Sequence, residues 1–275
     1  MRPFVALLLA ACGAPPAPPA RPERIVSLLP SFTEIVCALG AGGRLVAYTE
    51  HCRPDRDVPR LPWRDSAGAE AILRSDPHLV LRQSGRTSSD ALRDTLERAG
   101  VRVLSIPSET VADVRRAIAE IGAALGAEAR GREIVRRFDE ELEAARAAVA
   151  GGARPSVLFV FGRDHGAAAN VTAAGPGSFL DELIALAGGR NALAGFAQPY
   201  PTVSLEEILR LGPDVIIDNK PSEATEEEAR AAWRRLSTVP AVRSGRVHAI
   251  LDNHLLIPGP RLPEAVRALA RLIHG

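Results

Sequence analysis

Short apolar runs alternate along this chain with longer stretches in which apolar residues recur at helical spacing. Short runs of this kind predict buried β-strands, and their regular alternation with helices predicts parallel α/β structure. The predicted strands lie at residues 25–29, 79–81, 103–106, 157–161, 215–217 and 247–251.

One helical pattern, at residues 128–150, is longer than the others and lies in the middle of the chain. About 20 residues of helix extend roughly 30 Å, the width of a small domain. We therefore expect one long rigid backbone helix to join an N-terminal α/β lobe, residues 24–127, to a C-terminal α/β lobe, residues 151–275. The apolar face of this helix is formed by Ile134, Phe138, Leu142 and Ala145.

The two predicted lobes resemble each other in sequence. Residues 31–42 recur at residues 178–189, and residues 70–77 recur at residues 206–213. Self-similarity at this scale indicates two copies of one supersecondary plan. Each copy of the first segment starts with serine and has an acidic residue three positions later, which predicts a capping serine at a helix start. Two parallel-sheet lobes that face each other across a cleft form an architecture suited to holding a ligand.

The N-terminal residues predict an export signal. An apolar run at residues 4–11 is followed by a cysteine, and small residues precede that cysteine, as in bacterial lipoprotein signals. The run is too short for a membrane span, which needs about 20 apolar residues. We predict a signal peptide at residues 1–11, lipidation at Cys12 and a proline-rich tether at residues 12–23. An ordinary secretory signal with an incidental cysteine is the alternative.

Composition is that of a folded domain, with 46% apolar and 24% charged residues. The net charge of +1 gives no basic footprint for nucleic acid, so we expect no nucleic-acid partner. We also expect a monomer. Cys37 lies on the apolar face of a predicted helix, which favours a small core residue, and a disulfide with Cys52 is the alternative.

Several motifs follow one another along the chain in a characteristic order and spacing. They are Ile25-Val26-Ser27-Leu28-Leu29-Pro30-Ser31-Phe32-Thr33-Glu34, residues 70–81, Gly175-Pro176-Gly177-Ser178-Phe179-Leu180, Gly188-Gly189-Arg190-Asn191 and Val203-Ser204-Leu205-Glu206-Glu207-Ile208-Leu209. Through these motifs the chain resembles the helical-backbone (class III) periplasmic substrate-binding proteins of ABC importers for vitamin B12, iron-siderophores and haem, and it is most similar to the vitamin B12-binding branch. The resemblance covers about residues 24–274.

Glu70 and Glu206 occupy matched positions near the starts of equivalent predicted helices, one in each lobe. The resemblance implies that this pair lies on the rim and meets arginines of the ABC permease, where charged contacts fix the register of docking. The alternative is that both carboxylates only complement a helix dipole, worth about 0.3–1 kcal/mol. Ser204 and Glu207 already form a capping box in the sequence, which leaves Glu206 to point outward.

Two aromatic residues, Trp63 and Tyr200, lie beside prolines in predicted loops of opposite lobes. Flat rings on both sides of a cleft suit a large planar macrocycle. In the vitamin B12-binding branch, aromatics at these two positions contact the corrin, and the resemblance implies the same role here. The alternative is that each ring packs onto its own lobe. The chain departs from the family at Glu50 or His51 and at Gln83, where other family aromatics are missing.

Polar candidates for ligand contact follow predicted strands. His51, His165 and His254 lie in predicted loops at carboxyl ends of strands, where an imidazole is suited to bind cobalt or iron, with a solvated loop histidine as the alternative. Arg163 is a candidate for holding a phosphate or propionate, and the resemblance places Arg261 where the family's last cleft segment ends. The alternative for each arginine is a helix cap or a pair with Asp164 or Glu264. We expect no cofactor and no resident metal site, since the metal belongs to the transported ligand.

No catalytic motif is present: the chain lacks a G-x-S-x-G elbow and a phosphate-binding loop. We therefore expect a binding protein rather than an enzyme, located in the periplasm or on the outer face of the cell membrane through its lipid anchor. The expected ligand is cobalamin or a related corrinoid, delivered to an ABC permease. A ferric siderophore or haem is the alternative ligand. A stand-alone metal-chelate scavenger or sensor is the alternative of another class.

Overall fold

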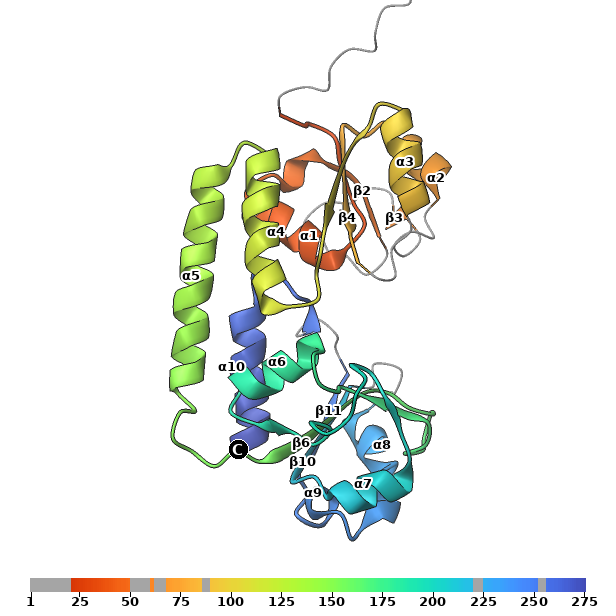
Figure 1. Ribbon diagram of the computed structural model, residues 1–275, viewed down its shortest axis with the longest axis vertical. Coiled ribbons are helices and arrows are strands. Elements are labelled where there is room, and N and C mark those ends of the chain that lie inside the picture. Colours follow the sequence, from red (N-terminus) through yellow and green to blue (C-terminus); the bar gives the residue numbers. More distant parts are fainter. Residues whose placement is uncertain (1–20, 50–59, 62–67, 86–89, 220–224, 252–255) are drawn as a thin grey trace, which may run out of the picture.

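The computed structural model describes residues 21–49, 60–61, 68–85, 90–219, 225–251 and 256–275. The described chain forms two α/β lobes, with a long helix running along one side of both (Figure 1). This is the predicted fold class. Among the residues that the structure describes, none of the helices combines the length and the hydropathy that a membrane span requires.

The N-terminal lobe is built on a parallel five-stranded sheet with the order β3-β2-β1-β4-β5. Its strands are β1 (Ile25–Ser27), β2 (Leu45–Thr49), β3 (Arg60–Leu61), β4 (Leu79–Gln83) and β5 (Arg102–Ile106). Its helices are α1 (Pro30–Ala38), the 3-10 turn η1 (Gly42–Arg44), α2 (Ala69–Leu73), α3 (Asp90–Arg98) and α4 (Val111–Ala124).

The C-terminal lobe contains a six-stranded sheet with the order β11-β10-β6-β7-β9, and β8 pairs with β6 off this path. Its strands are β6 (Ser156–Gly162), β7 (Val171–Ala173), β8 (Arg190–Asn191), β9 (Thr202–Val203), β10 (Val215–Asn219) and β11 (Val247–Ile250). Its helices are α6 (Phe179–Leu186), α7 (Leu205–Leu211), α8 (Glu226–Ala231), the 3-10 turn η3 (Arg234–Leu236), α9 (Pro240–Arg243) and α10 (Leu262–His274).

The prediction of a second purely parallel sheet is wrong, because β7 runs antiparallel to β6 and β9 runs antiparallel to β7. A parallel crossover needs a dozen or more residues. The connection at residues 163–170 is shorter than that, so the chain turns back beside β6. The remaining pairs of β6 are parallel: the pair with β10 as predicted, and the pair with β8, a strand that the sequence did not predict.

The helix starts of the two repeats differ. Ser178 caps α6 as predicted, since its hydroxyl accepts a hydrogen bond from the backbone N–H of Asp181 at 3.1 Å. The matching prediction for Ser31 is wrong: Leu29 is the N-cap residue of α1, with no side-chain cap. Pro30 explains the difference, because its fixed φ suits the first helical position, and the helix starts two residues earlier than a Ser31 cap would place it.

Helix α5 (Glu128–Ala147) is the predicted backbone helix, and it packs against α4 of one lobe and against α10. Phe138, Leu142 and Ala145 are buried on its inner face, and Ile134 is half-buried. These side chains belong to a single apolar cluster that includes residues of both sheets, α1, α4, α6 and α10. The lobes are therefore joined by a shared core as well as by the chain. Each sheet has a second, separate cluster on its outer face.

Candidate functional site: the cleft between the lobes

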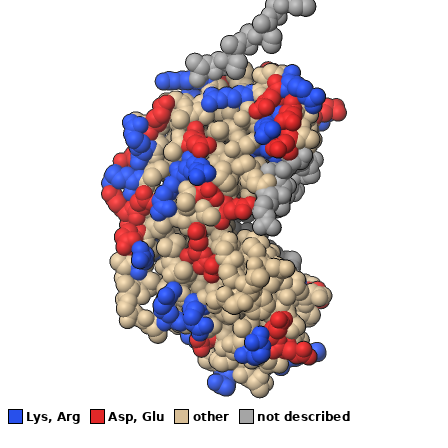
Figure 2. All heavy atoms as spheres, viewed as in Figure 1, with Lys and Arg blue, Asp and Glu red and all other residues tan. Residues whose placement is uncertain are grey.

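Figure 2 shows a hollow between the two lobes, on the side away from α5. The carboxyl ends of the parallel strands of both sheets point toward this region (Figure 1). Ligands of α/β folds bind beyond the carboxyl ends of strands, where loops rather than sheet edges meet them. The cleft is therefore the candidate site.

Tyr200 lies in the loop before β9, and its exposed fraction is 48%. Its ring meets Phe161, at the end of β6, edge to face with a centroid distance of 5.1 Å and an interplanar angle of 81°. Phe161 is itself 37% exposed. Sequence reasoning identified Tyr200 and missed Phe161, which it assigned to a buried strand. Together the two rings form an aromatic platform on the C-terminal lobe.

The loop that carries Tyr200 is held closely by the chain beneath it. The N–H of Gly175 donates to the carbonyl oxygen of Pro199 at 2.8 Å. A side chain at Gly175 would meet the carbonyl oxygen of Gln198 at 2.1 Å and the ring of Pro201 at 2.9 Å, so only glycine allows this approach. The position of the aromatic platform is thus set by backbone packing.

Glu109, in the loop between β5 and α4, faces this platform from the N-terminal lobe. Burial raises the pKa of Tyr200, and the negative charge of Glu109 raises it further. The negative charge of Glu109 thus acts on the tyrosine from the other lobe. Glu109 is exposed, and its carboxylate lies over Gly85, where a Cβ would stand 3.1 Å from Oε1. Sequence reasoning missed Glu109.

Arg163 does not take the predicted ligand-binding position. Its side chain is fully buried and pairs with the buried carboxylate of Asp218, with Nε donating to Oδ2 at 2.8 Å. The same Oδ2 accepts a hydrogen bond from Nε1 of Trp233 at 2.7 Å. Further guanidinium hydrogens go to the carbonyl oxygens of Asp164 and Ala229. Arg163 therefore links three elements inside the lobe: β10, α8 and the loop that follows β6.

Arg261 and Glu34 join the two lobes. Arg261 precedes α10, and its guanidinium donates to Oε1 of Glu34 on α1. The Arg261 side chain is 53% exposed and that of Glu34 is 21% exposed. Because this carboxylate neutralises it, Arg261 adds little net positive charge to the cleft. Neither predicted arginine thus supplies an uncompensated charge for an anionic ligand.

The other residues predicted to contact the ligand either lie on separate elements or fall outside the described residues. Gln83 is half-buried at the end of β4, and His165 is exposed in the loop after β6. Within the described ranges, no three His, Cys, Asp or Glu side chains are grouped to hold a metal ion. Cys37 is half-buried against the shared core. Outside the described residues lie His51, Trp63 and His254, together with Cys12 and Cys52.

Glu70 and Glu206 each occupy the second position of a short helix, α2 and α7. Figure 1 places both helices on the side of the molecule away from α5, one at each lobe. Glu70 is 88% exposed and pairs with Arg74 at 3.1 Å. Glu206 is exposed, because the predicted capping box of α7 uses Ser204 and Glu207 instead. Leu205 and Leu209, both more than 40% exposed, flank it.

Two α/β lobes around an open cleft, joined by one long helix and a shared core, define a two-lobe binding protein. The chain belongs to the periplasmic binding protein family, whose model matches residues 25–253. This confirms the predicted resemblance at the level of the family. Members of this family bind ligands and are not enzymes, so the expectation of a non-enzymatic protein is also confirmed.

Three known proteins show the range of this similarity. The chain is 29% identical to the uncharacterized ABC transporter substrate-binding lipoprotein YvrC of Bacillus subtilis, over 92% of this chain and 80% of that protein. It is 25% identical to the vitamin B12-binding protein of Vibrio parahaemolyticus, over 89% and 86%. It superposes on the periplasmic heme-binding protein RhuT from Roseiflexus sp. RS-1 with a TM-score of 0.81 and 26% identity, covering 92% and 98%.

Proposed function

We propose that this protein captures cobalamin or a related corrinoid in the cleft and delivers it to the permease of an ABC importer. The observation that carries the proposal is the platform of Tyr200 and Phe161, which offers exposed ring surface to a macrocycle. The similarity to a vitamin B12-binding protein over most of both chains supports the same ligand class.

The charged residues that the structure describes at the cleft favour a corrinoid over the alternative ligands. A polyanionic siderophore or the propionates of haem call for exposed positive charge, whereas Arg163 is buried and Arg261 is paired with Glu34. Glu109 adds a negative charge opposite the platform. A corrinoid with neutral amide side chains avoids this repulsion. Haem remains the second candidate, because the heme-binding protein RhuT shares the fold and 26% of the sequence.

Titration of residues 21–275, which contain every described element, with cyanocobalamin, dicyanocobinamide, haem and a ferric siderophore panel tests the ligand. Burying one aromatic ring against the ligand contributes about 1.5–3 kcal/mol to the free energy of binding. Tyr200→Ala and Phe161→Ala should therefore each weaken corrinoid binding at least tenfold. Trp63→Ala tests the predicted partner ring. Leu209→Ala, an exposed apolar change on α7, is the matched control and should bind normally. Tight haem binding without corrinoid binding would refute the corrinoid as the ligand. It would leave the assignment as a substrate-binding protein of an ABC importer intact.

We further propose that Glu70 and Glu206 dock the loaded protein onto arginines of the permease. Their exposure, their matched places in α2 and α7, and the acidic first turn they share support this role. In proteoliposomes with the permease, Glu70→Ala and Glu206→Ala should lower ligand uptake without changing ligand affinity. Glu128→Ala is the control, because Glu128 also lies in a first turn but on α5. Equal uptake by all three variants would refute the docking role.

The N-terminal anchor is a proposal of its own. The cysteine at position 12 and the proline-rich residues 13–22 suit a lipid anchor with a semi-rigid spacer. Cys12→Ser should move the protein from the membrane fraction to the soluble fraction, and mass spectrometry should detect acyl groups only on the wild-type protein. A soluble wild-type protein without acyl groups would contradict this proposal.

A further inference from the structure

A second pocket lies at the joint between the lobes, among helices rather than at strand ends. Its volume is about 730 Å³, and its walls are the start of α4, the second half of α5, the chain at residues 149–154 and the outer face of α6. Small-molecule sites typically enclose about 300–1,000 Å³. None of Tyr200, Phe161 and Glu109 lines it, so this pocket is distinct from the cleft.

Charged and apolar side chains both line this pocket. Arg115, Arg146 and Arg154 line it, against one carboxylate, Glu182. Glu182 is already engaged, because its Oε2 accepts a hydrogen bond from the N–H of Val111 at 2.7 Å. The apolar wall is formed by Val111, Leu142, Val149, Ala185 and Leu186.

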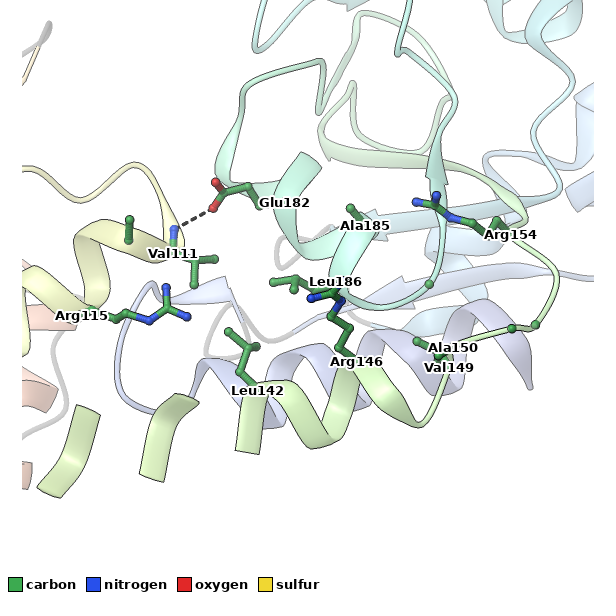
Figure 3. Close-up of a pocket in the computed structure, with 14 residues that line it drawn as sticks. Val111, Arg115, Leu142, Arg146, Val149, Ala150, Arg154, Glu182, Ala185 and Leu186 are labelled. Atoms are coloured by element: carbon green, nitrogen blue, oxygen red, sulfur yellow. Dashed lines mark hydrogen bonds between the residues drawn. The ribbon is translucent and has the colours of Figure 1, made fainter. Parts of the chain in front are cut away.

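The arginines keep donors available for a ligand. A guanidinium group has five N–H donors. Arg115 pairs with Asp139, and Arg146 lies 3.6 Å from Glu143 with its side chain 66% exposed. Figure 3 shows Arg115 and Arg146 extending from different helices toward the space beside Leu142. Two guanidinium groups next to an apolar wall suit an acid group attached to an apolar body.

We propose that this pocket binds an anionic amphiphile, with its acid group at Arg115 and Arg146 and its apolar body against Leu142 and Leu186. This site goes beyond capture of the transported ligand and does not depend on which ligand the cleft holds. Its walls come from α4 and α5 on one side and α6 on the other, so an occupant contacts both lobes.

Fluorescence titration of residues 21–275 with 8-anilinonaphthalene-1-sulfonate, and competition by decanoate, tests the site. Wild-type protein should bind the probe saturably at one site, and decanoate should displace it. Arg146→Ala removes a charged hydrogen-bond donor and should weaken binding about tenfold. Arg137→Ala is the matched control, since Arg137 is an exposed arginine of the same helix that does not line the pocket. Ala185→Trp, at an exposed position, should fill the pocket and abolish binding.

The competing outcomes are separable. Binding that is lost in Tyr200→Ala or under saturating cyanocobalamin would place the probe in the cleft and overturn the proposal. If inorganic phosphate displaces the probe as effectively as decanoate does, the pocket is a simple anion site. This result would refute the proposal that it binds an amphiphile. Unchanged binding in both Arg146→Ala and Ala185→Trp, or no saturable binding to the wild type, would overturn it as well.

Discussion

Replacing Asp218 with asparagine should destabilise the C-terminal lobe strongly. Asp218 is the fourth of the five residues of β10 and its carboxylate has no solvent exposure. One of the carboxylate oxygens accepts hydrogen bonds from both Arg163 and Trp233. Asp218→Asn leaves the shape almost unchanged and removes the charge. The guanidinium of Arg163 then stays buried beside a neutral amide.

The expected loss follows from the cost of an uncompensated buried charge. Breaking a buried ion pair by removing one partner costs about 3–5 kcal/mol, and we expect this range for Asp218→Asn. Trp233→Phe removes one hydrogen bond to the carboxylate and should cost about 2 kcal/mol. The double replacement Arg163→Met with Asp218→Leu removes both charges, so its stability should lie closer to the wild type than that of Asp218→Asn.

Urea unfolding followed by circular dichroism measures these differences, as shifts in midpoint at a constant denaturant slope. A cost below about 1 kcal/mol for Asp218→Asn would refute the buried pair. The same series tests the placement of Arg163. Under conditions where it is folded, Arg163→Met should bind ligand normally, because its side chain does not reach the cleft. A variant with normal stability and lost ligand binding would restore the role in ligand binding that the sequence predicted.

Three further predictions concern the cleft. Because the pKa of Tyr200 is raised in the folded state, its contribution to stability is complete below pH about 10 and is lost as pH rises through the higher folded value. Ultraviolet titration should show a lower Tyr200 pKa in Glu109→Gln, and an unchanged value would contradict the facing geometry. Gly175→Ala should cost about 1–3 kcal/mol through its clash with Gln198, whereas Gly195→Ala, with nothing within 4 Å, should be tolerated when urea midpoints are compared. A double-mutant cycle on Glu34 and Arg261 should give a coupling of about 0.2–1 kcal/mol, and zero coupling would show that the lobes are not joined there.

Most of the fold could be predicted because its strands are continuous apolar runs. Strands such as β1, β6 and β10 are buried on both faces, which leaves a signal that short sequence windows detect. β7 was missed because three residues, Val171–Ala173, carry no comparable run. The direction of β7 depends on the length of the preceding connection, which a strand-by-strand prediction did not weigh.

The site was less predictable, because its contacts join residues far apart in the chain. Arg163 follows a strand, where a ligand contact is expected, but its partner Asp218 lies on the neighbouring strand β10. Only the strand order shows that these two side chains meet. Phe161 has the same composition signal as the buried residues before it, and only its place at the strand end exposes it. The positions of Glu70 and Glu206 at matched helix starts could be predicted, because both residues lie in the internal repeat.

The cleft between the lobes is open, whereas the joint that connects the lobes is closely packed. The shared core continues from α5 into both lobes, and polar contacts such as Glu34 with Arg261 and Glu182 with the start of α4 cross between them. Large closure would have to separate these contacts and pull buried side chains out of one cluster, which close packing opposes. Ligand capture therefore depends on a platform that is already in place, and a preformed site loses little affinity to ordering. Affinity should then follow the ring surface and charge of the cleft rather than the energy of a hinge motion.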